Sequence, residues 1–199
     1  MYYNPTLNDI KSYEDLMCMY NTSFSKNIKK FKDYYKIYKE DIPITTIYQT
    51  VKENPIQLID DRYVITYYVT YKSLEELKAI KFKEIESSFE RMSKNAFVIS
   101  SCGFKIDANE TANRDVDGLI KIMKAEEYNE ELFKDYNNEL HTVTLNDLET
   151  MQLEIIKNGR NLYSQKWKFI SDINALETEE EVANYNILYK NMDFSNVNK

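Results

Sequence analysis

Hydrophobic positions along this chain recur with two different periods, and the change between them falls near residue 72. Before that point, six apolar residues follow one another in alternating steps of four and three: Phe24, Ile28, Phe31, Tyr35, Tyr38 and Ile42. Steps of this size place side chains on one face of a helix, so the sequence predicts a helix over about residues 13–40. Lysines occupy much of the remaining surface of that helix.

Three segments after this helix have the composition of strands, with many β-branched and aromatic residues: 44–51, 56–60 and 62–71. In the last segment, successive side chains point to opposite faces. Tyr63 and Tyr67 share one face, and Tyr68 belongs to the other. The dipeptide Asp60–Asp61 is a natural turn before this strand. Region 1–72 is therefore expected to combine a helix with a small antiparallel sheet.

Both faces of the 62–71 segment are apolar, and the predicted helix can cover one of them. Either the rest of the chain or another subunit must cover the second face, since clustered aromatic surfaces mark protein contacts. We interpret Tyr63, Tyr67 and Tyr68 as candidate partner-binding residues. Region 1–72 then becomes a candidate attachment module.

The second region, residues 73–199, contains helix starts in which a Ser, Thr or Asp precedes an acidic residue by three positions. The pairs are Ser73–Glu76, Asp107–Glu110, Thr144–Asp147 and Thr178–Glu181. Each pair can satisfy the first free amide groups of a helix. Together they predict four helices: 74–94, 108–127, 145–174 and 178–190.

Apolar residues in these helices repeat with helical spacing. Val116, Ile120 and Met123 form the expected buried face of the second helix. In the third helix, Trp167 is expected to be buried against the first helix. Gly159 is expected to kink or interrupt the third helix, because glycine disfavours a helix interior.

Two short extended segments between the helices, 97–106 and 139–144, are expected to pair as a β-hairpin. The predicted fold class is therefore α+β and predominantly α-helical. Region 1–72 supplies an N-terminal helix and a small antiparallel sheet, and region 73–199 supplies a helical domain with a short β-hairpin.

Composition also changes near Lys72. Twelve of the 17 tyrosines lie in residues 1–72. That region has 10 basic and 9 acidic residues, the remainder has 16 and 24, and the net charge of the chain is −7. A negative charge of this size argues against a general nucleic-acid-binding protein.

The chain is expected to be soluble, because its apolar runs are too short to span a bilayer and its start, MYYNPTLND, is too polar for a signal peptide. Cys18 and Cys102 lie far apart without a CxxC pattern. Two isolated thiols of this kind favour reduced cysteines in an intracellular chain.

Oxygen-bearing side chains stand at alternate positions in one segment, as they do in calcium loops: Asp107, Asn109, Thr111, Asn113, Asp115 and Asp117. An EF-hand loop that began at Asp107 would need Gly at its sixth position and Glu at its twelfth. This chain has Ala112 and Gly118 there. We therefore interpret the segment as a helix start capped by Asp107, and we expect no metal site in it.

His141 is the single histidine of the chain, which excludes a multi-histidine metal site. It could approach Cys102 if their extended segments were neighbours, but no third group or oxyanion site completes a catalytic arrangement. Sequence motifs of nucleotide-binding loops and zinc proteases are missing as well. We expect no enzymatic activity, no cofactor and no metal.

Three motifs of the second region occur together in a known family. They are the GFxIDAN turn (Gly103, Phe104, Ile106, Asp107, Ala108 and Asn109), the DYNNxLHTVTL strand (Asp135 to Leu145) and the LYxxKW helix (Leu162, Tyr163, Lys166 and Trp167). With them, residues 73–190 resemble a domain of undefined function found in phage and prophage tail proteins, often beside tail-fibre or baseplate genes. The family brings no catalytic residues.

The resemblance implies a structural protein of a bacteriophage tail or tail-like particle, acting as an adaptor at the baseplate or tail-fibre attachment site. Its partners would be other phage tail or baseplate proteins, and it would be oligomeric within the particle, with no nucleic acid and no membrane insertion. Its location would be the virion tail, and the host cytoplasm during assembly. One alternative is a tail-fibre assembly chaperone absent from the mature particle. Another is an enzyme that acts on a host surface polymer.

Overall fold

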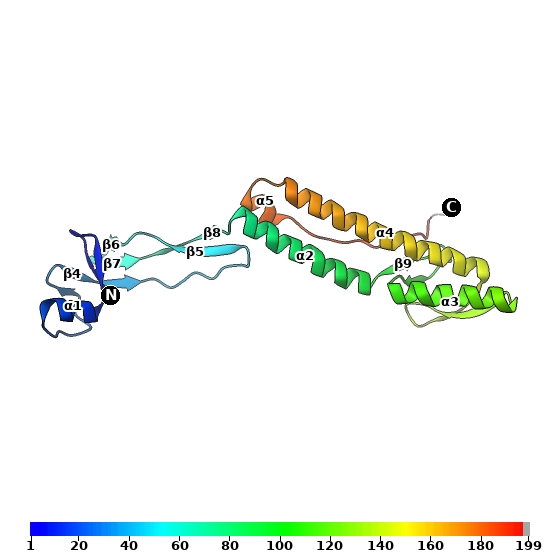
Figure 1. Cartoon of the computed structure of the whole chain (residues 1–199), viewed down its shortest axis with the longest axis horizontal. Helices are drawn as coiled ribbons and strands as arrows, with labels where there is room; N and C mark the ends of the chain where they lie inside the picture. Colours follow the sequence, from blue (N-terminus) through cyan, green and yellow to red (C-terminus); the bar gives the residue numbers. More distant parts are fainter. Residues whose placement is uncertain (197–199) are drawn as a thin grey trace. The chain divides into compact units, whose positions relative to one another are not determined.

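The structure, a computed structural model, describes residues 1–196, and the chain divides between Lys72 and Ser73 into two units (Figure 1). Helical residues make up 42% of the structure and strand residues 24%. The prediction of a predominantly helical protein is therefore wrong, and the fold is mixed α+β. The strands of the first unit account for much of the difference, because they replace most of the long helix that the sequence predicts there.

The first unit contains one short helix and a six-stranded sheet. Its elements are β1 (Tyr2–Asn4), β2 (Asp9–Lys11), α1 (Tyr13–Tyr20), β3 (Lys30–Phe31), β4 (Tyr34–Lys39), β6 (Gln57–Ile59) and β7 (Arg62–Ile65). The strand order is β2-β1-β4-β7-β6, and β3 pairs with β4 off this path. Strands β4 and β7 run parallel, whereas the other pairs in this sheet are antiparallel. The prediction of a purely antiparallel sheet is therefore wrong.

Helix α1 ends at Tyr20, so the predicted helix over 13–40 is wrong beyond its first two turns. Asn21 adopts a left-handed conformation with φ of 48°, and its amide donates to carbonyl oxygens at the end of α1. Asparagine tolerates this conformation, which ends a helix. The aromatic residues that follow favour strands, and Tyr34 is buried in β4 together with Tyr2 and Leu16.

The predicted strand 62–71 is divided in two. Strand β7 ends at Ile65, and β8 (Tyr67–Tyr71) pairs instead with β5 (Gln49–Glu53) in a separate two-stranded ribbon. The turn predicted at Asp60–Asp61 is confirmed, since both residues have positive φ angles, 46° and 58°, and join β6 to β7. Two aspartates with positive φ match the type of turn that joins adjacent strands.

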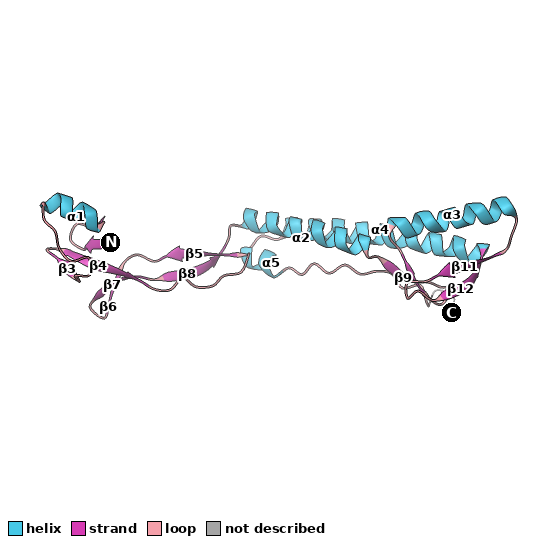
Figure 2. Cartoon of the chain, turned by 90° about the horizontal axis from the view of Figure 1, so that it is seen from below, coloured by secondary structure: helices cyan, strands magenta, loops and turns pink. Residues whose placement is uncertain are grey.

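Over its described residues, 73–196, the second unit contains four helices and two separate hairpins. Its elements are α2 (Leu74–Lys94), β9 (Phe97–Ile99), β10 (Lys105–Asp107), α3 (Glu110–Glu126), β11 (Glu130–Lys134), β12 (Leu140–Thr144), α4 (Leu145–Ala175) and α5 (Glu179–Asn184). Helix α4 packs against both α2 and α3 (Figure 2). Strand β9 pairs with β10, and β11 with β12. The predicted pairing of segment 97–106 with 139–144 is therefore wrong.

The helix starts of this unit follow the sequence closely. Capping boxes are present at Ser73, Thr144 and Thr178, as predicted. Helix α3 also begins where a helix was expected, but its N-cap is Asn109, whose side chain accepts the amide of Ala112 at 2.9 Å. Asp107 instead ends strand β10, so its prediction as a cap is wrong.

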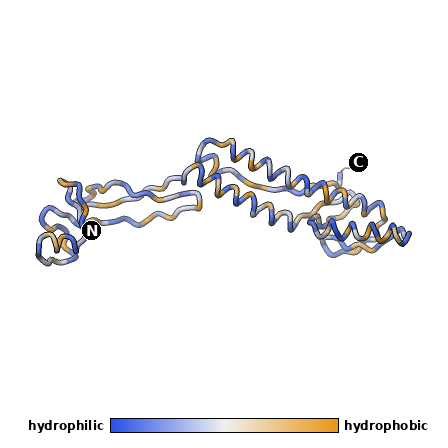
Figure 3. Tube along the Cα trace, viewed as in Figure 1, coloured by the Kyte–Doolittle hydropathy of each residue, from blue (hydrophilic) through white to orange (hydrophobic). Residues whose placement is uncertain are grey.

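The core of the second unit forms where α2, α3 and α4 meet the two hairpins. Apolar residues alternate with polar ones along each helix, as the hydropathy colouring in Figure 3 shows. Val116, Ile120 and Met123 of α3 are buried, as predicted. Two aromatic residues that follow α5, Tyr189 and Phe194, complete the same core.

Two predictions about α4 are wrong. The helix continues through Gly159 without interruption. Trp167 is 64% exposed rather than buried. Its neighbour Lys166 faces α2 instead, with Nζ 4.6 Å from the centre of the Phe89 ring and 2.6 Å from a carboxylate oxygen of Glu86. The buried stripe of α4 thus lies beside Trp167 and does not include it.

Candidate functional site

The three tyrosines selected as partner-binding residues occupy different environments. Tyr63 lies in β7, where its half-buried ring is 5.3 Å from the ring of Tyr3 and 5.0 Å from that of Tyr35. Tyr67 and Tyr68 lie in β8, and Tyr68 is 46% exposed. Tyr63 therefore contributes to the packing of the first unit, whereas Tyr68 presents its side chain to solvent.

The ribbon formed by β5 and β8, here called the β5–β8 ribbon, has no buried residue in either strand. Tyr68 is opposite Lys52, and Val69, which is 39% exposed, is opposite Val51. Hydrogen bonds hold its ends, including one of 2.8 Å from the Asn54 side chain to Thr66. A two-stranded ribbon is marginally stable without a core, so this one has apolar surface available for a partner.

Both outer edges of the β5–β8 ribbon are unpaired within residues 1–196, because each strand pairs only with the other. An unpaired edge exposes a row of backbone donors and acceptors. Tyr68 and Val69 are consecutive, so they project from opposite faces. The ribbon can therefore accept a partner by added strand pairing at an edge or by side-chain contact on a face.

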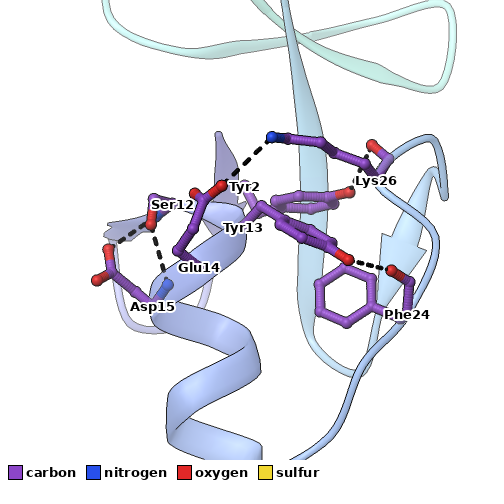
Figure 4. A network of polar contacts seen from close by, with 7 residues as sticks. All are labelled: Tyr2, Ser12, Tyr13, Glu14, Asp15, Phe24 and Lys26. Atoms are coloured by element: carbon purple, nitrogen blue, oxygen red, sulfur yellow. Dashed lines mark hydrogen bonds and ion pairs between the residues drawn. The ribbon is translucent and has the colours of Figure 1, made fainter.

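The other aromatic cluster of the first unit is part of its structural core. Figure 4 shows how the hydroxyl group of Tyr13 donates to the carbonyl oxygen of Phe24, and how that of Tyr2 donates to the carbonyl oxygen of Lys26 at 3.2 Å. The Phe24 ring stacks on Phe31 at 4.0 Å. Glu14 pairs with the Lys26 side chain at 3.3 Å. These contacts tie α1 and the loop after it to β1, and most of the rings are engaged internally.

One group of potential metal ligands lies in the β11–β12 turn. Asp135, Glu139 and His141 offer ligand atoms that all lie within 4.8 Å of one another. The Asp135 carboxylate is buried, and its Oδ1 accepts the amides of Asn137 and Glu139, each at 2.8 Å. Its Oδ2 is 3.2 Å from Nε2 of His141. These hydrogen bonds account for the buried charge, so we assign Asp135 and His141 a structural role.

Two opposing effects set the pKa of Asp135. Burial would raise it, but hydrogen bonds from the Glu139 amide, His141 and the Asn137 amide outweigh burial and hold the pKa below its usual range. The imidazole of His141 also stacks on Phe104, with 4.0 Å between ring centres. The arrangement fixes the turn and links β12 to the β9–β10 hairpin.

A second buried carboxylate lies near Cys102. Glu154 accepts hydrogen bonds from Ser101 through its amide at 3.0 Å and its hydroxyl at 2.6 Å. The Cys102 sulfur is 3.9 Å from Asp147, whereas His141 contacts Asp135. Burial is the main cause that raises the pKa of the Cys102 thiol. A thiol held protonated in this way is a poor nucleophile, so the structure offers no support for a Cys–His catalytic pair.

An apolar groove of about 350 Å³ lies where the end of α2 and the start of α3 meet the middle of α4. Phe89, Ile155 and Leu162 contribute to its walls. Ile156 and Tyr163 lie at the same groove and also belong to the exposed side of α4. This surface and the β5–β8 ribbon are thus two apolar regions that can contact other proteins.

Comparison with protein families gives one match, over residues 73–187, to the domain of unknown function DUF4376. The match spans more than half of the chain. The chain belongs to this family. No curated protein and no solved structure matches it. The family description carries no activity, and the matched range includes α2, α4 and both hairpins of the second unit.

In the part of the chain that the structure describes, each helix is too short or too polar to cross a bilayer.

Sequence reasoning missed the Asp135–His141 pair and the exposed side of α4. A signal for the first was present, because Asp135 lies just before a turn-forming Asn-Asn pair and His141 is the second residue of the return strand β12. The second was missed because the helical spacing of Trp167 from Ile170 and Ile173 assigned Trp167 to the buried face of the helix.

Proposed function

We propose that this protein is a structural component of a bacteriophage tail or tail-like particle, and that it acts as an adaptor at the baseplate or tail-fibre attachment site. The motif resemblance of residues 73–190 supplies the biological setting. The observation that carries the binding role is the β5–β8 ribbon, which exposes aromatic and aliphatic side chains and has no buried residue. A role in assembly contact would give this exposed apolar surface a function.

The proposal places the partner, another tail or baseplate protein, on the face of the ribbon that contains Tyr68. Tyrosine suits such contacts because it combines a large apolar ring with a hydroxyl group and has few rotatable bonds. Tyr67 lies next to Tyr68 on the same strand, whereas the Tyr63 ring packs against Tyr3 and Tyr35 in the six-stranded sheet. The protein would reside in the virion tail after assembly in the host cytoplasm.

The test uses particles from a host in which the gene carries Tyr68→Ser, which changes only the proposed face of the ribbon. We expect the amount of this chain in purified particles to fall at least about tenfold, as the loss of an aromatic anchor predicts. Ile44→Ser is the matched control, because Ile44 lies in the same unit, is 99% exposed and is outside the ribbon.

Quantitative mass spectrometry of the particles decides the outcome. Normal incorporation of the ribbon variant would refute the attachment role of the ribbon. If the wild-type chain is absent from mature particles but fibres do not assemble without it, the protein is an assembly chaperone and not an adaptor.

A further inference from the structure

Helix α4 has a second apolar stripe in addition to the one that faces the core. Four large apolar residues on it are exposed: Leu153 (58%), Ile156 (45%), Tyr163 (49%) and Trp167 (64%). They lie on one helix of 31 residues. Exposed apolar residues that line up along one face of a helix indicate a contact surface, whereas single exposed apolar residues are normal.

The stripe has the spacing of a coiled-coil contact. Its members, here called the outer stripe, follow one another in steps of three and four: Leu153, Ile156, Arg160, Tyr163, Trp167 and Ile170. Glu149 and Asn174 continue the same spacing at the two ends. This alternation corresponds to a mean period of about 3.5 residues and places one seam along the helix for a facing helix.

The rest of the second unit leaves much of the outer stripe exposed, although the Tyr163 ring also packs against Phe89 of α2, with 4.8 Å between the ring centres. The segment after α5 runs along α4, but it is attached on a different side. Asn161 and Gln165 donate to the carbonyl oxygen of Lys190 at 2.9 and 2.8 Å, and Asn158 accepts the amide of Met192 at 2.8 Å. These anchoring residues alternate with members of the outer stripe and do not belong to it.

We propose that the outer stripe binds the outer stripe of a second copy of this chain, with the two α4 helices antiparallel. The charge pattern selects this direction. In a parallel pair in register, each Arg160 would face Arg160 of the second copy, which places like charges together. In the antiparallel pair, Arg160 faces the Tyr163 ring of the second copy, where a guanidinium group is attracted to the ring face.

The same antiparallel register matches the remaining positions. Ile156 faces Trp167 of the second copy, and Leu153 faces Ile170 of the second copy. Glu149, whose carboxylate forms an ion pair with Lys124 of α3 at 2.6 Å, faces the neutral Asn174. The pairing is symmetric, as a two-fold dimer requires, because each contact occurs twice.

The groove provides space for the largest side chain in this register. Ile156, Gly159 and Tyr163 lie at the groove of about 350 Å³. No heavy atom lies within 4 Å of the position that a Cβ atom would take at Gly159. Trp167 of the second copy, which faces Ile156, can therefore extend over Gly159 into the groove. This self-association is independent of the proposed tail function.

The first experiment measures the mass of the full chain by sedimentation equilibrium over a range of concentrations. We expect a reversible dimer, weakened at least about tenfold by Trp167→Ser, because tryptophan is a frequent energetic centre of interfaces. Leu132→Ser is the control, since Leu132 is 60% exposed in the same unit but lies on β11. A monomer at all concentrations would overturn the proposal, as would equal dimerisation of Trp167→Ser.

The second experiment tests direction by disulfide cross-linking, in full-length protein with Cys18 and Cys102 replaced by serine. Leu153→Cys and Ile170→Cys proteins, which keep Trp167, are oxidised separately and as a mixture. The antiparallel register predicts a cross-linked dimer only in the mixture, because each of these positions faces the other. Cross-linking of Leu153→Cys with itself would contradict the register.

Discussion

Asp135 is a buried carboxylate whose oxygens accept hydrogen bonds from two backbone amides and lie next to His141. Burial opposes its ionised form, but the hydrogen bonds prevail and the pKa is lowered. The folded-state pKa then lies below the unfolded value of about 3.9. The carboxylate therefore stabilises the fold above about pH 4, and this contribution is lost as the pH falls through the lowered pKa.

We predict that Asp135→Asn lowers the melting temperature at pH 7. The difference from wild type should shrink as the pH falls below about 4, where the wild-type carboxyl also becomes neutral. Thermal denaturation at several pH values measures this. Asp115→Asn, at an exposed position of α3, is the control and should change little. A difference that stays constant down to pH 2 would show that ionisation of Asp135 does not matter.

Trp167 leads to a prediction on stability. Because it is exposed, Trp167→Ala should change the unfolding free energy of the dilute protein by no more than about 0.5 kcal/mol. Leu162→Ala, at a buried position of the same helix, should cost about 2–5 kcal/mol. Urea denaturation measures both. Equal losses for the two variants would place Trp167 in the core after all.

The single tryptophan also reports on its surroundings through fluorescence. Its emission in dilute solution should resemble that of tryptophan in water and should be quenched by acrylamide. If the α4 helices associate, the emission should shift to shorter wavelength as the concentration rises. The sequence could not show this exposure, because Trp167 and Lys166 are neighbours and only the packing of α2 decides which of them faces inward.

At the scale of elements, local signals predicted the structure well. The capping pairs at Ser73, Thr144 and Thr178 correctly predicted three helix starts, since each pair acts within one turn of its own helix.

The prediction of a helix over residues 13–40 was wrong, although the spacing of its apolar residues suits a helix. The left-handed conformation of Asn21 ends α1 early. The prediction of which strands pair was also wrong, because the sequence of a strand does not specify which distant strand lies beside it.

The start of α3 provides a prediction for this scale. Asn109→Ala should lower the unfolding free energy by about 1 kcal/mol, because it removes the side chain that accepts the Ala112 amide. Asp107→Ala should cost less, since Asp107 is an exposed residue at the end of β10. Chemical denaturation of the two variants distinguishes them. A larger loss for Asp107→Ala would restore it as the cap.

At the scale of the whole chain, the division between Lys72 and Ser73 separates two sets of contacts. We predict that a fragment of residues 73–199 folds by itself, because its core residues come from its own helices and hairpins. Its circular dichroism should show a cooperative thermal transition. If the fragment incorporates into particles at the normal level, the proposed attachment role of residues 1–72 is wrong.

Composition indicated this division, since most tyrosines precede it. The role of the outer stripe and of the groove could not be read from composition, because both depend on which face of α4 the other helices leave uncovered. The candidate tyrosines illustrate the same limit. All three were chosen by alternation along one strand, but the chain breaks that strand at Thr66 and places Tyr63 in a different sheet from Tyr67 and Tyr68.

The aromatic residues after α5 have a consequence for how the family region is isolated. Sequence similarity ends at residue 187, whereas Tyr189 and Phe194 are buried in the core of the second unit. The hydroxyl group of Tyr189 also donates to the carbonyl oxygen of Ile85 at 3.3 Å, and Phe194 donates its amide to Ile99 at 2.8 Å. A fragment cut at residue 187 would therefore expose a cavity where two rings belong. The folded unit therefore extends several residues beyond the end of the match to the family.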